Sequence, residues 1–147
     1  MQTFPKKSRN RSLGLVGAVA ASVVAVTLFA NSGSSESAAD IAVREQLAVV
    51  AESFNAQLPT MLDQYTRLDS TEALPERRFA YRYTIVGMQK IPQRYQIVNE
   101  ARPKVVKAYR TADNMREMRE LNVTVLYVYS DEKGDEVVRF EVGPEDL

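Results

Sequence analysis

The 147-residue sequence predicts an α+β domain that follows a membrane-spanning helix. This prediction rests on one long apolar segment near the N-terminus, two segments with helical spacing of apolar residues, and several strand-like segments. After the membrane helix, the predicted order is helix, strand, strand, helix, strand, strand. Strands that follow one another through short turns form hairpins, so we expect an antiparallel sheet of about four strands with the helices on one face.

The predicted membrane helix is the uncharged segment 13–30. Its 18 residues would form a helix of about 27 Å, close to the thickness of a bilayer's hydrocarbon core. The segment follows a basic tail, residues 1–12, whose charged residues are Lys6, Lys7, Arg9 and Arg11. This charge asymmetry predicts a signal-anchor with a cytoplasmic N-terminus, a short linker at residues 31–37, and an extracytoplasmic domain at residues 38–147.

A cleaved signal peptide, which would leave a secreted protein, is the alternative interpretation of this segment. Signal peptides have apolar regions of about 7–15 residues, and cleavage after Ala30 would place Leu28 where a small residue is preferred. We therefore expect a single-pass protein of a bacterial inner (cytoplasmic) membrane with a periplasmic domain. Gly14 and Ala18 have the small-xxx-small spacing of helix dimers, which suggests a homodimer through the anchor.

Two later segments have helical periodicity. In residues 38–58 an apolar stripe at intervals of three and four predicts an amphipathic helix that docks on the sheet, with members Val43, Leu47, Val50, Phe54 and Leu58. Residues 92–120 repeat the pattern. Pro103 should kink or divide this second helix, and a further break is expected near residues 111–113.

The remaining segments favour strands. Residues 61–74 predict an irregular edge strand, and residues 79–88 predict a regular one with alternating side chains. Residues 123–129 are apolar on both faces, as is typical of an interior strand. They are followed by a turn at residues 131–134, with Gly134 in the left-handed conformation, and by a last strand at residues 137–142.

Composition excludes several kinds of chemistry. The chain has no cysteine and no histidine, which excludes disulfides, thiolate chemistry, Cys/His zinc sites and histidine acid–base catalysis. Without the four basic residues of the N-terminal tail, 15 basic and 19 acidic residues remain. A net acidic domain disfavours nucleic acid as a partner. We expect no cofactor and no metal site.

Two sets of residues are candidates for binding. Tyr81, Tyr83, Tyr127 and Tyr129 have same-face spacing on two predicted strands, so they form either an aromatic recognition platform or part of the core. A basic cluster of Arg77, Arg78 and Arg82 is either a site for an anionic partner or a charged edge.

Parts of the sequence resemble small exported bacterial α+β domains of uncharacterised function. The resemblance covers MREMRELNVTVLYVYSDEKGDE at residues 115–136, the end VGPEDL at 142–147, LPTMLDQYTRLD at 58–69, and FAYRYT at 79–84. It implies a small export domain and transfers no catalytic residue. The family pattern often has one cysteine near the position of Arg110 and another at the C-terminal position, which is Leu147 in this chain. This sequence has neither cysteine.

The leading functional hypothesis is a membrane-anchored extracytoplasmic accessory module that binds another protein and is not an enzyme. The first alternative is a module that binds a small apolar molecule or lipid between sheet and helices. The second is a hydrolase that uses Asp63, Asp69 or Glu72 as paired carboxylates.

Overall fold

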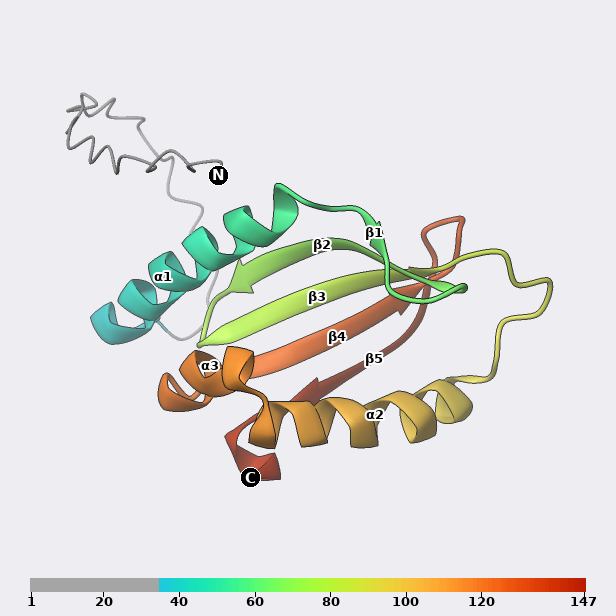
Figure 1. The fold of residues 1–147 in the computed structure, drawn as a ribbon. Helices are drawn as coiled ribbons and strands as arrows, with labels where there is room; N and C mark the ends of the chain where they lie inside the picture. The colour runs from blue at the N-terminus through green and yellow to red at the C-terminus, as the bar shows by residue number, and fades with distance from the viewer. Residues whose placement is uncertain (1–34) are drawn as a thin grey trace, which may run out of the picture. The chain divides into compact units, whose positions relative to one another are not determined.

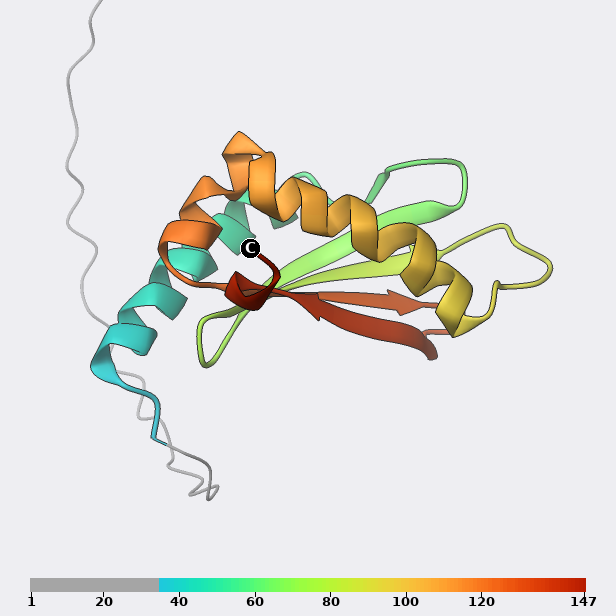
Figure 2. The same cartoon turned by 90° about the horizontal axis from the view of Figure 1, so that it is seen from below.

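A computed structural model describes residues 35–147. These residues form one five-stranded mixed sheet with its helices on one face (Figures 1 and 2). The elements in chain order are α1 (Ala38–Asn55), β1 (Thr60–Met61), β2 (Thr66–Leu74), β3 (Arg78–Ile85), α2 (Arg94–Thr111), η1 (Asp113–Met115), α3 (Arg116–Glu120), β4 (Thr124–Ser130), β5 (Glu136–Val142) and η2 (Pro144–Asp146). The predicted α+β class is confirmed.

The predicted basic tail, membrane helix and most of the linker lie outside the described residues. Within residues 35–147, no helix combines the length and the apolar character needed to cross a bilayer.

The sheet corrects the prediction of a purely antiparallel arrangement. Its strands lie in chain order, and β3 and β4 pair in parallel, whereas the other neighbours are antiparallel. The reason is the long connection through α2, which returns the chain to the end of the sheet where β3 began. There the Thr124 N–H donates to the Arg77 carbonyl at 2.9 Å, which starts the parallel ladder.

Helix α1 begins as its sequence suggests and docks on the sheet. Ser37 is the N-cap, and its Oγ accepts from the Asp40 N–H at 3.1 Å. Val43 and Leu47 of the predicted stripe are buried against the sheet, which confirms that part of the docking prediction. The helix ends at Asn55, and Phe54 remains 40% exposed although its ring contacts Tyr81 of β3 edge-on.

The end of α1 also protects an edge of the sheet. The Asn55 Nδ2 donates to the Thr71 carbonyl at 2.9 Å, and the Asn55 Oδ1 accepts from the Thr71 N–H at 2.7 Å. The amide side chain thus makes the two hydrogen bonds that a further strand would make with β2. In the part of the chain that the structure describes, only the two residues of β1 pair with this edge of β2, so Asn55 closes a position that would otherwise be open to pairing.

Helix α2 does not divide at Pro103, which lies in its interior. The predicted break near residues 111–113 is confirmed, because α2 ends at Thr111 and η1 starts at Asp113. The Arg119 guanidinium stabilises this break by donating to the carbonyls of Tyr109 (2.6 Å) and Ala112 (3.0 Å). The Tyr109 carbonyl lies in the last turn of α2, and the Ala112 carbonyl also accepts from the Met115 N–H of η1 at 3.1 Å.

The two faces of the sheet differ in how they are covered. The helix-covered face carries the main core, in which Phe79, Val125 and Val142 have no exposed surface. No helix of residues 35–147 lies on the open face, yet Ala80, Leu126 and Val128 are buried there. Long charged side chains pair across this face, and their apolar stems shield the strands.

The Asn55–Thr71 pair generates a stability prediction. Replacing Asn55 with Ala should lower the free energy of unfolding by about 1–2 kcal/mol, because it leaves a partly buried backbone donor and acceptor unpaired. Chemical denaturation of the full-length protein in detergent, followed by circular dichroism, measures the change. Gln46→Ala, at an exposed amide on the same helix, is the control and should stay within about 0.5 kcal/mol of the parent. If both variants lowered the free energy of unfolding by the same amount, the role of Asn55 in protecting the edge of β2 would be contradicted.

Candidate functional site

The four predicted tyrosines lie on one face, as their spacing indicates. Tyr81 pairs directly with Tyr127, and Tyr83 with Tyr129, across the parallel strands. Their rings stack side by side, with centroids 5.8 Å apart in the first pair and 4.8 Å in the second, and Phe140 of β5 extends the array. This aromatic array faces the helices, so it is part of the core rather than an open platform.

Burial differs along the array. Tyr81, Tyr83 and Tyr127 are 8%, 9% and 2% exposed, whereas Tyr129 is half-buried. Burial raises the pKa of each of these phenols, because the charged phenolate loses its hydration. At Tyr129 the negative charge of Asp63 adds to this effect.

The three predicted arginines do not form one basic cluster. Arg77 donates from Nε to Asp40 at 2.5 Å and from Nη1 to the Leu121 carbonyl at 3.1 Å, so it links the start of α1 to the end of α3. Arg78 and Arg82 lie on the open face instead, where they pair with Glu141 and Glu72. Each guanidinium therefore has a carboxylate partner within the domain.

The three candidate hydrolase carboxylates are also separated. Asp69 and Glu72 lie toward the open face, where they pair with Arg67 and Arg82. Asp63 lies near the helix-covered face, and its Oδ1 accepts from the backbone N–H groups of Tyr65 and Thr66, both at 2.8 Å. Of the three acids, Asp63 lines the cavity described below, whereas Asp69 and Glu72 are each paired with an arginine elsewhere.

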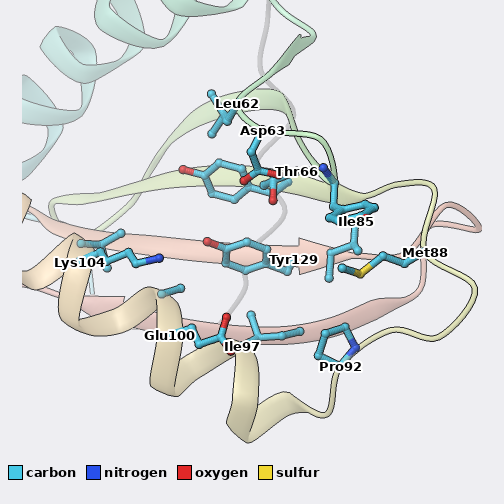
Figure 3. A pocket seen from close by; sticks show the side chains of 14 residues that line it. Leu62, Asp63, Thr66, Ile85, Met88, Pro92, Ile97, Glu100, Lys104 and Tyr129 are labelled. Atoms are coloured by element: carbon cyan, nitrogen blue, oxygen red, sulfur yellow. Dashed lines mark hydrogen bonds between the residues drawn. The ribbon is translucent and has the colours of Figure 1, made fainter.

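A cavity of about 330 Å³ opens above the aromatic array. It lies between the β1–β2 connection, the loop that follows β3, and the N-terminal half of α2 (Figure 3). Tyr83 and Tyr129 form its floor, and the charged groups at its rim are Asp63, Glu100 and Lys104. The backbone hydrogen bonds from Tyr65 and Thr66 hold the pKa of Asp63 below its usual value, with a smaller contribution from the charge of Lys104. We call this space the tyrosine cavity.

A second hollow, of about 550 Å³, runs along the C-terminal half of α1 beside β1 and β2. We call it the α1 groove; its lining is uncharged and consists of Val49, Val50, Ser53, Phe54, Gln57, Leu58, Thr60, Leu62 and Leu68. Exposed apolar side chains concentrate around it: Val49 is 68% exposed, Leu62 56% and Met61 48%. Leu62 lines both hollows.

Sequence reasoning located neither hollow, although the alternative of a small-molecule or lipid module requires a cavity between sheet and helices. Val49 lies off the apolar stripe of α1, and this departure from amphipathic order was the available signal for the groove. Met61 and Leu62 were assigned to an irregular strand, with no indication that they would stay exposed. In the described residues, no group of three or more acidic side chains is placed to hold a metal ion.

The buried phenols generate a pH prediction. Their pKa values are raised above the value of about 10 in the unfolded chain, so they favour the folded state below that pH and lose this contribution as the pH rises above it. The free energy of unfolding should therefore fall between about pH 9 and pH 11, and Tyr83→Phe should make that fall shallower. Denaturation measured across this range provides the test. Tyr95→Phe removes a hydroxyl from a residue that is 58% exposed and is the control, for which we expect the parental slope. A slope in Tyr83→Phe equal to that of the parent would refute the assignment.

Solved structures of very different sequence share this fold. A candidate secreted protein from Pseudomonas aeruginosa is similar with a TM-score of 0.66 at 9% identity, over 76% of this chain and 98% of that chain. The type II secretion system pilotin EpsS from Vibrio vulnificus has a TM-score of 0.60 at 10% identity, over 74% and 94% of the two chains. The type II secretion system pilotin AspS from Vibrio cholerae has a TM-score of 0.56 at 10% identity, over 74% of this chain and 95% of that chain.

At such identities these similarities establish the fold and nothing further. No curated protein matches the sequence. A family model does match, over residues 42–139, which span most of the described domain from α1 into β5. This agrees with the resemblance to small bacterial domains of uncharacterised function, and the chain belongs to the family described as Domain of unknown function (DUF8479).

Proposed function

We propose that this protein is a membrane-anchored, extracytoplasmic accessory module that binds a protein partner through the α1 groove and performs no catalysis. The observation that carries the proposal is the groove itself. It is an open hollow with an entirely uncharged lining, flanked by the exposed side chains of Val49, Met61 and Leu62. Contiguous apolar surface of this kind is typical of protein interaction sites, since leaving it in water is unfavourable.

The groove also contains a suitable anchor residue. Phe54 is 40% exposed at the end of α1. Its ring makes an edge contact with the ring of Tyr81, and the two ring centroids are 6.2 Å apart. One side of the ring is therefore held by the core while the other remains available. Aromatic side chains fixed in this way frequently dominate the energetics of an interface.

The shared fold supports an accessory role. Two of the similar structures are named as pilotins of type II secretion systems, which are components of export machinery. We propose that this chain likewise serves an assembly of the bacterial envelope. The separation of Asp63 from Asp69 and Glu72 supports a role without catalysis.

The candidate binding residues inferred from the sequence have different roles in this proposal. Tyr83 and Tyr129 keep a binding role, because they line the tyrosine cavity beside the groove. We assign Tyr81 and Tyr127 to the core that supports Phe54. Arg77, Arg78 and Arg82 serve the domain's own ion pairs.

Membrane anchoring is the second part of the proposal. It rests on the apolar segment 13–30 and the basic residues that precede it, which together favour a helix that is retained with its N-terminus in the cytoplasm. Pairing of two such helices through Gly14 and Ala18 remains a prediction.

Intact mass spectrometry of the membrane-extracted protein tests the anchor. We expect a mass near 16.5 kDa, which corresponds to the whole chain, and retention in the membrane fraction after an alkaline wash. A mass that matches a chain beginning near residue 31 would instead identify a cleaved signal and a secreted domain.

Site-directed photocrosslinking in native membranes tests the groove. Because the chain has no cysteine, Ser53→Cys introduces a single attachment point for a benzophenone probe on the groove lining. We expect one reproducible protein adduct. Adding Val49→Asp should reduce its yield about tenfold or more, since it places a charge in an apolar interface.

The matched control for this experiment is Ile41→Asp. Ile41 is 38% exposed on the same helix and does not line the groove, so this variant makes the same apolar-to-acidic change elsewhere on α1. Its adduct yield should equal that of the parent. Loss of the adduct in both variants, or in neither, would overturn the groove as the binding site.

A further inference from the structure

The floor of the tyrosine cavity carries a hydroxyl that donates no hydrogen bond to any protein group within residues 35–147. Tyr83 is 9% exposed and lies on the cavity floor. Among the tyrosine hydroxyls of residues 35–147, that of Tyr109 alone donates a hydrogen bond to a protein group, the Val123 carbonyl at 2.9 Å. No buried side-chain nitrogen or oxygen of residues 35–147 lacks a hydrogen-bond partner, so the Tyr83 hydroxyl is accessible from the cavity. It is therefore available to donate a hydrogen bond to a molecule bound there.

The cavity is also divided into an apolar end and a charged end. Ile85, Met88 and Pro92 gather at one end, and Lys104 lies at the other (Figure 3). The apolar side chains come from the end of β3 and the loop after it, whereas Lys104 comes from α2. A molecule that fills this space must therefore have an apolar body and a polar head.

The charged end presents both signs. Asp63 projects from the β1–β2 connection, and Glu100 and Lys104 project from α2 (Figure 3). No ion pair forms among these three groups, whereas the arginines of the open face are all paired. A head group with an ammonium for the carboxylates and an oxyanion for Lys104 would satisfy all of them.

We infer that the tyrosine cavity binds a small zwitterionic amphiphile, whose apolar body lies against Ile85, Met88 and Pro92 and whose head lies between Asp63 and Lys104. Its oxyanion accepts a hydrogen bond from the Tyr83 hydroxyl. The volume of about 330 Å³ is at the lower end of the range for small-molecule sites, so the ligand has one chain or one ring system. This site adjoins the α1 groove at Leu62 but takes a different ligand from the protein partner proposed for the groove.

Native mass spectrometry of the full-length protein in a nonionic detergent tests the inference. Lauroyl lysophosphatidylethanolamine and L-phenylalanine share the required chemistry, the first from the membrane and the second from the aqueous compartment. We expect one of them to bind at one-to-one stoichiometry, which supports the site and identifies the source. Laurate and dodecylamine each carry one sign of charge and should bind about tenfold more weakly. Binding of neither zwitterion, or equal binding of the singly charged probes, would overturn the inference.

Two matched pairs of variants locate the site. Tyr83→Phe and Lys104→Met should each weaken binding about tenfold, since each removes one hydrogen bond to a charged head. Tyr95→Phe and Lys107→Met remove the same groups from exposed positions outside the cavity and should bind as the parent does. Loss of binding in the controls, or its retention in both cavity variants, would place the ligand elsewhere.

A variant that fills the tyrosine cavity distinguishes this inference from the proposal for the α1 groove. Ala101 lies on the cavity wall, so Ala101→Phe should abolish ligand binding while the Ser53 crosslink persists. Conversely, Val49→Asp should abolish the crosslink and leave ligand binding intact. Ligand binding by Ala101→Phe at the parental level would refute the cavity site, whatever the crosslinking experiment shows.

Discussion

The direct parallel register of β3 and β4 is the constraint on which the rest of the domain depends. It places Tyr81 opposite Tyr127 and Tyr83 opposite Tyr129, so that large rings stack across the centre of the sheet. Offset stacking adds to the free energy gained from burying these rings. Tyr83 and Tyr129 also form the floor of the tyrosine cavity, which lies between α2 and the β1–β2 connection.

The same register gives the sheet two faces with different roles. The helix-covered face carries the core and the tyrosine cavity, and the α1 groove adjoins it. The open face carries alternating arginines and glutamates whose charges are matched within the domain, as in the Arg82–Glu72 pair at 2.6 Å. Because such exposed pairs contribute little to stability, their main effect is to give an uncovered sheet face a polar surface.

Much of the fold could be predicted from local pattern. The capped start of α1, the break after Thr111, the turn with Gly134 at φ 89°, and the shared face of the four tyrosines all follow from spacing and turn chemistry. The direction of β4 could not be predicted in this way. Its residues are equally suited to parallel or antiparallel pairing, and the path of the α2 connection decides between them.

The sequence by itself determined the class of the domain, its main elements and the exclusion of cysteine and histidine chemistry, because these depend on composition and on periodicities of two and 3.6 residues. Only the tertiary structure decided which charges are neutralised and where hollows remain. Arg78 meets Glu141, and Asn55 meets Thr71, across separations that no local pattern encodes. Both hollows arise where elements distant in the chain fail to close against each other, a property of packing that no single segment contains.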